Sequence, residues 1–145
     1  MPSHVVIRIF IVEDDQRRVD WFRAWLPKDM RLVHARSGGR ALGVIQRDRT
    51  AFSGIMLDHD LQQQAISASD SNISGSIVIR ALMQFISPTV PVFIHSMNPE
   101  KSITMTNALE KYGFSVTRIP MGEMSKTAFL EWLEEVREYH EEMTS

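Results

Sequence analysis

The sequence predicts an α/β fold, in which a doubly wound, five-stranded parallel sheet is covered by helices on both faces. Short apolar runs alternate five times with stretches whose apolar residues recur at helical spacing. The apolar runs are nearly continuous, which is typical of strands buried on both faces of a sheet. Right-handed crossovers between parallel strands then place helices on both sides. We expect the strand order 2-1-3-4-5, within a single domain over residues 1–145.

The first strand and helix have clear limits in the sequence. Val5–Val12 is a run of β-branched and apolar residues that ends at acidic residues, and it predicts the first strand. A helix should follow over Asp15–Leu26, because Val19 and Phe22 fall on one helical face and Pro27 marks its end. This helix would bury its apolar face against the sheet.

The second and third strands are separated by a short helix. Arg31–Ala35 predicts the second strand, and the sequence Ser37-Gly38-Gly39 leads into the helix. Phe52–Asp58 predicts the third strand. The polar stretch Gln62–Ser74 follows it and has little apolar surface to offset its ordering entropy. We therefore expect this stretch to be either a mobile lid or a disordered loop.

The remaining elements are delimited by capping residues, glycine and proline. Asparagine before proline is a good helix start, and glycine supplies a left-handed stop. The predicted elements are a helix over Gly75–Ile86, a strand over Pro91–Ile94, a helix from Pro99 to Gly113 capped by Asn98, a strand over Phe114–Ile119, and a last helix capped by Ser125.

Composition excludes several classes of protein. The chain has no cysteine, which rules out disulfide scaffolds, Cys-ligated zinc sites, iron–sulfur clusters and thiol nucleophiles. Sixteen basic and 18 acidic residues give a net charge of −2, too balanced for a broad duplex-DNA-binding surface. The N-terminus lacks the basic flank of a signal peptide, and no stretch is long and apolar enough for a membrane span. We expect a cytoplasmic protein with no membrane partner.

Polar side chains gather where the first, third and fourth predicted strands end. In a sheet ordered 2-1-3-4-5 these three strands are neighbours, and ligand sites of such sheets lie beyond the carboxyl ends of the strands. The polar groups should therefore converge on one pocket. They are Glu13 and Asp14 after the first strand, Asp58, His59 and Asp60 after the third, and His95, Ser96 and Asn98 after the fourth.

Carboxylates that converge in this way repel one another unless a cation or a proton lies among them. The predicted pocket therefore favours a metal ion. Oxygen ligands favour Mg²⁺, whereas participation of His59 or His95 shifts the preference toward Mn²⁺ or Zn²⁺. Each carboxylate also has a purely structural explanation: acidic residues complement helix dipoles, and Asp58 or Asp60 could simply make turns.

Histidines at the ends of adjacent strands suggest proton transfer. An imidazole has a reference pKa of about 6.5 and can give or take a proton at neutral pH. His59 and His95 are therefore candidate general acid and base, and the alternative is that each orients a loop through a backbone hydrogen bond. His4, His34 and His140 are predicted away from the pocket, and no role is assigned to them.

The segment Ile9-Phe10-Ile11-Val12-Glu13-Asp14-Asp15 resembles the first strand and acidic pair of response-regulator receiver domains, which have a flavodoxin-like fold. The resemblance in order and spacing covers nearly the whole chain. It implies that Glu13 and Asp14 bind Mg²⁺, that Asp58 accepts a phosphoryl group, and that the Ser96 hydroxyl follows the phosphoryl oxygen. The implied chemistry is coherent, since a cation offsets repulsion between a carboxylate nucleophile and a phosphate.

The sequence departs from receiver domains at two places. Receivers carry a lysine before the proline that follows strand five, whereas Ile119 precedes Pro120 here. Arg118 is one residue away and should point to the opposite face; Lys101 is a candidate substitute cation. The second departure is Leu57-Asp58-His59-Asp60-Leu61 with its long polar loop, where receivers have a short loop that contains proline.

At these two places the sequence resembles a narrower group of proteins, the cyclic-phosphate processing receiver-like domains. That group shares Leu-Asp-His-Asp-Leu after strand three and His-Ser-x-Asn after strand four, which stand here as residues 57–61 and 95–98. The resemblance implies action on cyclic phosphate ends or cyclic nucleotides. Ring opening would need a base and an acid, which His59 and His95 could supply, and positive charge on the phosphate oxygens, which a metal on Asp14 and Asp58 could supply. Ser96, Asn98 and Lys101 are candidate phosphate-binding residues.

The leading hypothesis is thus a metal-dependent phosphoesterase, or a phosphate-ester binder, whose partner is a phosphate-containing small molecule or a nucleic-acid end. The first alternative is a signalling receiver that is phosphorylated on Asp58. Its protein partner would bind the face between the helix that starts at Pro99 and the helix capped by Ser125. The second alternative is a pseudo-receiver that acts only by binding proteins.

Overall fold

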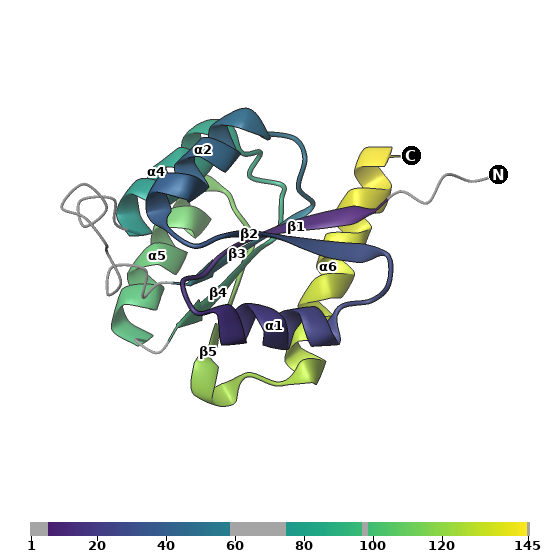
Figure 1. The fold of residues 1–145 in the computed structure, drawn as a ribbon. Coiled ribbons are helices and arrows are strands. Elements are labelled where there is room, and N and C mark those ends of the chain that lie inside the picture. The colour runs from purple at the N-terminus through teal and green to yellow at the C-terminus, as the bar shows by residue number, and fades with distance from the viewer. Residues whose placement is uncertain (1–5, 59–74, 97–98, 145) are drawn as a thin grey trace.

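The computed structural model describes residues 6–58, 75–96 and 99–144. Five parallel strands form one sheet in the order β2-β1-β3-β4-β5, which confirms the predicted topology. Figure 1 shows the sheet seen obliquely, with the helices on its two sides. The strands are β1 (Ile7–Val12), β2 (Met30–Ala35), β3 (Gly54–Asp58), β4 (Val92–Ser96) and β5 (Val116–Pro120).

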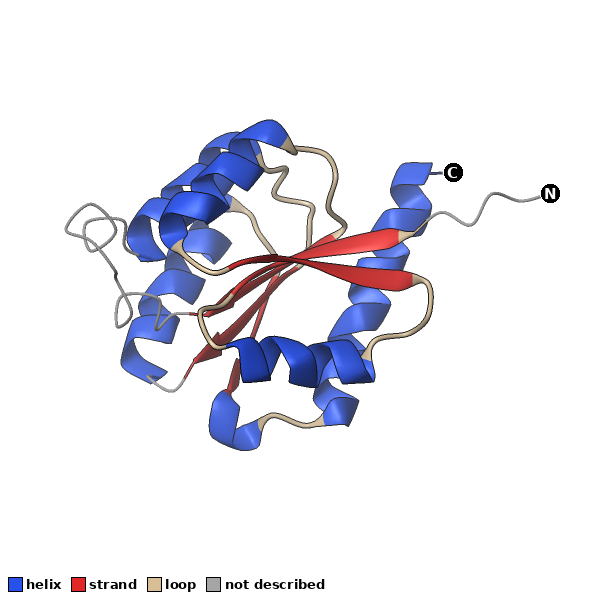
Figure 2. Cartoon of the chain, in the orientation of Figure 1, coloured by secondary structure: helices blue, strands red, loops and turns tan. Residues whose placement is uncertain are grey.

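Helices cover both faces of the sheet, as right-handed crossovers require. Three of them lie on one face and two on the other (Figures 1 and 2). The first group is α2 (Gly38–Arg47), α4 (Gly75–Phe85) and α5 (Pro99–Tyr112); the second is α1 (Gln16–Trp25) and α6 (Lys126–Thr144), and a short 3-10 helix, η2 (Met121–Glu123), follows β5.

Strand β4 is longer than the sequence predicted. The prediction ended it at Ile94, but the parallel ladder continues, with His95 beside Asp58 of β3 and Ser96 beside Pro120 of β5. Backbone pairing on both sides therefore keeps polar residues in the strand. His95 and Ser96 belong to the sheet itself and not to the loop after it.

Two apolar clusters fill the space on either side of the sheet. Successive strand residues point to opposite faces. Phe10, Val12 and Leu57 accordingly pack toward the α2/α4/α5 face, whereas Ile11 and Met56 pack toward the α1/α6 face. At the start of β3, Gly54 lets α6 approach the sheet, since a Cβ atom there would lie 2.8 Å from a methyl carbon of Val136.

Helix ends follow the predicted signals. The Asp15 carboxylate accepts a hydrogen bond from the Arg17 amide at the start of α1, and the Ser125 hydroxyl caps α6 through the Ala128 amide. Gly113 ends α5 with φ of 114°, a left-handed conformation that glycine adopts without strain. The predicted start of α5 at Pro99 is also observed.

The polar stretch predicted over residues 62–74 lies outside the described residues. Within the described part of the chain, no helix combines the length and the apolar character that crossing a membrane requires.

Candidate functional site

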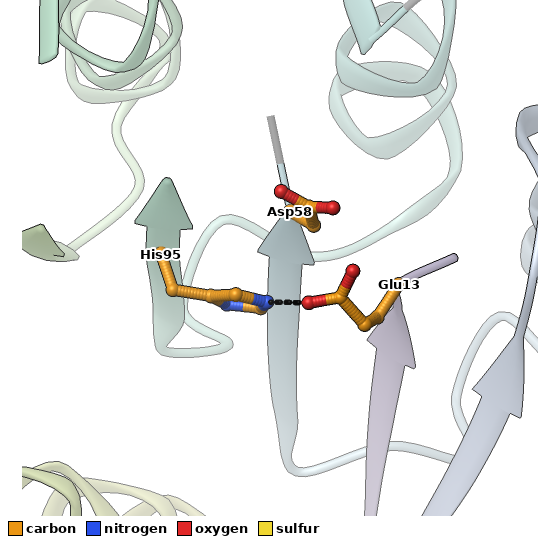
Figure 3. A group of neighbouring side chains, drawn as sticks. All are labelled: Glu13, Asp58 and His95. Carbon is orange, nitrogen blue, oxygen red and sulfur yellow. Dashed lines mark hydrogen bonds and ion pairs between the residues drawn. The ribbon is translucent and has the colours of Figure 1, made fainter. Parts of the chain in front are cut away.

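Three polar side chains meet at the carboxyl edge of the sheet: Glu13 directly after β1, Asp58 at the end of β3, and His95 in β4. One ligand atom from each lies within 4.8 Å of the other two, and all three residues are fully buried. Figure 3 shows His95 and Glu13 reaching toward each other across β3, with Asp58 at the end of that strand. We call this group the Glu13–Asp58–His95 cluster. It confirms the predicted convergence of the first, third and fourth strands.

The alternation of side chains along the strands explains why these residues share one face. Ile9 and Ile11 belong to the apolar cluster between the sheet and α1/α6, and Glu13 is the next residue of the same parity. Met56 and Phe93 belong to the same cluster and precede Asp58 and His95 by two residues. The polar cluster therefore continues the α1/α6 layer of the core at the sheet edge.

Hydrogen bonds hold Glu13 in place. Its Oε1 accepts a hydrogen bond from Nε2 of His95 at 3.1 Å, and its Oε2 accepts one from the Asp15 amide at 3.2 Å. The Phe22 ring packs edge-on against the His95 imidazole, with ring centroids 5.3 Å apart. Both carboxylate oxygens of Glu13 are thus engaged, and the imidazole is fixed by an aromatic neighbour.

Arg18 supplies the positive charge beside this cluster. Its Nη1 lies 3.5 Å from Oε1 of Glu13 and 3.7 Å from Oδ2 of Asp58. The Arg18 side chain is 23% exposed, so it reaches from solvent into the buried site. Sequence analysis missed this residue. The available signal was helical spacing: Arg18 precedes Phe22 by four residues and so shares the sheet-facing side of α1.

Burial and charge change the proton affinities in the site. Burial raises the pKa of Glu13, against the lowering effects of Asp58, the Asp15 amide and Arg18, and the Asp14 side chain adds to the rise. Burial lowers the pKa of Arg18, but the Glu13 and Asp58 carboxylates outweigh it and raise the pKa overall. The guanidinium therefore stays charged, and Glu13 holds a proton more readily than an exposed glutamate does.

His34 holds the backbone of the site, a role that sequence analysis did not assign. Its Nε2 donates a hydrogen bond to the Glu13 carbonyl oxygen at 2.6 Å. The Glu13 amide in turn donates to the Ala35 carbonyl at 3.0 Å, so the backbone pairing of β1 with β2 extends one residue past the strand. Strand β2 thus fixes the position of Glu13 from the side opposite to His95.

The structure places the other predicted site residues as follows. Asp14 is half-buried beside Glu13 but does not belong to the cluster of three ligand-bearing residues found in the described chain. Ser96 ends β4 and Lys101 lies in α5, and their side chains are outside the described part of the structure. His59 and Asn98 also lie outside the described residues.

Ile119 occupies the end of β5, where receiver domains carry lysine. Its Cα pairs with that of His95, and its side chain packs against the apolar cluster of the α1/α6 layer. Arg118 is adjacent in the strand and pairs with Ile94, a residue of the opposite cluster. Ile119 therefore makes this part of the β5 side apolar, and among the side chains that the structure describes the nearby positive charge is that of Arg18 on α1.

The donor set fits a divalent cation. Ligands at about 2.1 Å from an octahedral ion lie about 3 to 4.2 Å apart, depending on whether they are adjacent or opposite. His95 Nε2 and Glu13 Oε1 lie 3.1 Å apart, the spacing of adjacent ligands, and a cation held between them would take the place of the hydrogen that Nε2 now donates. The two carboxylates suit Mg²⁺, and the imidazole nitrogen shifts the preference toward Mn²⁺ or Zn²⁺.

Solved structures of receiver domains have the same fold. A signal receiver domain of an HD domain-containing protein from Pseudomonas fluorescens Pf-5 has a TM-score of 0.69 at 15% identity, covering 94% of this chain and 98% of its own. The response regulator domain of Thermotoga maritima CheB has a TM-score of 0.65 at 20% identity, covering 92% and 96%. A response regulator receiver domain protein from Clostridium thermocellum has a TM-score of 0.67 at 13% identity, covering 97% and 100%.

Among curated proteins, no sequence relative matches the chain. One protein-family model does match, the cyclic-phosphate processing receiver domain, over residues 9–111. The matched region runs from β1 into α5 and includes all three residues of the Glu13–Asp58–His95 cluster. This chain, with its five-stranded receiver fold, therefore belongs to the family of cyclic-phosphate processing receiver domains.

Proposed function

We propose that the protein binds a divalent cation at the Glu13–Asp58–His95 cluster and uses it to bind and hydrolyse cyclic phosphate esters. The observation that carries the proposal is the placement of three potential ligand atoms within 4.8 Å of one another, in a fully buried site. Burying carboxylates is costly unless positive charge accompanies them. The family to which the chain belongs supplies the substrate class.

Each cluster residue would contribute one ligand atom: an oxygen of Glu13, an oxygen of Asp58 and a nitrogen of His95. When bound, the cation would offset the charge of the phosphate and polarise its oxygens. Arg18 would contribute a second positive group, since its guanidinium already lies against both carboxylates. Receiver domains carry a positively charged lysine at the position of Ile119, whose side chain here is apolar. Arg18 would supply that positive charge from α1.

Hydrolysis of a cyclic phosphodiester adds a water oxygen to phosphorus and breaks one ester P–O bond, and the proton from water passes to the departing hydroxyl. The guanidinium of Arg18 would donate hydrogen bonds to the phosphate oxygens, which gain negative charge in the transition state. His59 remains the candidate for proton transfer. His95 has two possible roles, as a ligand or as an acid–base group, and these predict different results for its variants.

The first experiment measures turnover of a 2′,3′-cyclic nucleotide in Mg²⁺ and in Mn²⁺, together with Mn²⁺ affinity. We expect Glu13→Gln and Asp58→Asn to lose both activity and metal binding. The matched control is Asp20→Asn, which removes a carboxylate on α1 that is 64% exposed. A protein without metal-dependent turnover, and with unchanged Mn²⁺ affinity in both cluster variants, would refute the proposal.

His95→Gln separates the two roles of that imidazole. Loss of Mn²⁺ affinity along with turnover would identify His95 as a ligand. Intact affinity with lost turnover would identify an acid–base residue, in which case the wild-type rate should follow a bell-shaped pH profile near neutrality. His140→Gln is the control, because His140 bonds Ser53 just before β3, at the other edge of the sheet.

A signalling receiver remains the second candidate, favoured by the position of Asp58 at the end of β3 in a receiver fold. In that case a small acyl-phosphate donor and Mg²⁺ should add one phosphoryl group, detected as a mass increase that Asp58→Ala abolishes. A partner would then bind the face between α5 and α6. A protein with neither adduct, turnover nor metal-dependent stabilisation would fit a module that only binds proteins.

A further inference from the structure

A shallow cavity, open to solvent, lies beside the Glu13–Asp58–His95 cluster, between α1 and η2. Its volume is about 430 Å³, within the range of small-molecule sites, and its walls are formed by Asp15, Arg17, Arg18, Trp21 and Met121. Arg18 belongs to both sites, because the same side chain that lines this cavity reaches Glu13 and Asp58. A ligand in the cavity would therefore contact the same guanidinium that pairs with the polar cluster.

Trp21 gives the cavity an aromatic wall. Its side chain belongs to neither apolar cluster, and the residue is 49% exposed, unusual for the largest side chain. The indole stacks on the half-buried Trp25, with ring centroids 5.5 Å apart and an angle of 26° between the planes. Trp25 in turn packs against the core of the α1/α6 layer. An exposed ring supported in this way is a rigid stacking surface.

Cationic and apolar groups complete the wall around this ring. The Arg17 side chain is 93% exposed, and it lies on the same turn of α1 as Arg18. Met121 contributes a half-buried, polarisable side chain from η2. An aromatic ring beside guanidinium groups is the combination that binds a nucleobase together with its phosphate.

We propose that this cavity is a nucleoside subsite, in which the base stacks on Trp21 while the attached phosphate lies against the Arg18 guanidinium, beside the polar cluster. The inference rests on the proposed function and narrows its substrate class to phosphate esters that carry a nucleobase. A free nucleotide and an RNA end share this chemistry. Stacking accepts every base because each has a π face, so the subsite selects a nucleoside over a simple sugar phosphate without strong base preference.

The test compares two probes in Mg²⁺, a nucleoside 3′-monophosphate and ribose 3-phosphate, which differ only in the base. Stacking contributes about 1–3 kcal/mol per base, a change of about 5- to 150-fold in Kd. We expect Trp21→Ala to weaken binding of the nucleotide by that factor and to leave ribose phosphate binding unchanged. Trp21→Phe should restore most of the nucleotide affinity, because it keeps a stacking ring.

Tyr112→Ala is the matched control, because Tyr112 is a 53% exposed aromatic residue at the end of α5, away from the cavity. If Trp21→Ala binds the nucleotide as well as Tyr112→Ala does, while Glu13→Gln abolishes binding, only the nucleoside subsite is refuted. If wild-type protein binds neither probe at any Mg²⁺ concentration, the proposed function fails as well.

A short oligoribonucleotide that ends in a 3′-phosphate separates the two nucleotide sources. Tighter binding than the mononucleotide identifies an RNA end, and equal or weaker binding identifies a free nucleotide. In both cases the proposal requires Trp21→Ala to weaken binding, and an oligoribonucleotide that binds independently of Trp21 would overturn it.

Discussion

Replacement of Arg18 by methionine tests the electrostatics of the site directly. Methionine keeps an unbranched apolar stem but removes the guanidinium that lies 3.5 Å from Glu13 and 3.7 Å from Asp58. Both carboxylate residues are fully buried. Removing one partner of a buried ion pair costs about 3–5 kcal/mol, because the remaining charge is left without compensation.

Arg18 itself is 23% exposed, so we expect the lower end of that range, about 3 kcal/mol at pH 7 without metal. For a domain of this size, 1 kcal/mol corresponds to about 2–4 °C in Tm, so the variant should melt about 6–12 °C lower. Thermal unfolding followed by circular dichroism measures this shift. Arg23→Met is the control, since Arg23 lies on the same helix, is 44% exposed and pairs only weakly with Asp20 at 4.0 Å.

Added Mg²⁺ should rescue the Arg18 variant. A cation at the same carboxylates replaces the lost positive charge, and saturation at 100 times Kd adds about 2.7 kcal/mol. In wild-type protein the ion has to share these oxygens with Arg18, so its stabilising effect should be smaller. Equal melting temperatures for the Arg18 and Arg23 variants, or equal Mg²⁺ shifts in wild type and Arg18→Met, would refute this account of the site.

Three further substitutions test the scaffold by denaturant unfolding. Gly54→Ala should cost about 1–3 kcal/mol, because the new Cβ atom would lie 2.8 Å from Val136, and an unchanged midpoint would contradict this. Gly113→Ala should cost about 1–2 kcal/mol, because a residue with a side chain is strained at φ of 114°. Unfolding at the wild-type midpoint would contradict this prediction. Arg137 lowers the pKa of Asp29 below 3.8, so their half-exposed pair stabilises the fold above that pH and is lost as pH falls through the lowered value. Asp29→Asn should therefore lower the free energy of unfolding by about 0.5–1 kcal/mol at pH 7 and by progressively less below pH 3.8. A difference between variant and wild type that does not change with pH would show that the charges of the pair do not contribute.

Strand and helix positions could be predicted from the sequence because local pattern and tertiary position agree in most of this chain. The apolar run of β1 and the cap at Ser125 are local signals, and the structure confirms them. The end of β4 could not be predicted in the same way. His95 is polar and so suggests a loop, but its pairing with Asp58 depends on a neighbouring strand from a distant part of the sequence.

The candidate site shows the same division between local and distant information. Strand order brings Glu13, Asp58 and His95 together, and this could be predicted from topology alone. The contacts of Arg18 and His34 with Glu13 depend on side-chain direction and on distances across elements. Sequence analysis therefore identified the carboxylates and the imidazole but not the two residues that neutralise and position them.

The alternation of side chains couples the Glu13–Asp58–His95 cluster to the hydrophobic core. Each cluster residue stands two positions after a residue of the α1/α6 core layer. Glu13 follows Ile11, Asp58 follows Met56, and His95 follows Phe93. An insertion of one residue within any of these strands would turn its polar group toward the α2/α4/α5 layer and expose or misplace the apolar residues before it. Insertions or deletions in the loops beyond the strand ends do not alter which face each strand residue points to. The surrounding loops and α1 can therefore vary while the sheet keeps Glu13, Asp58 and His95 together.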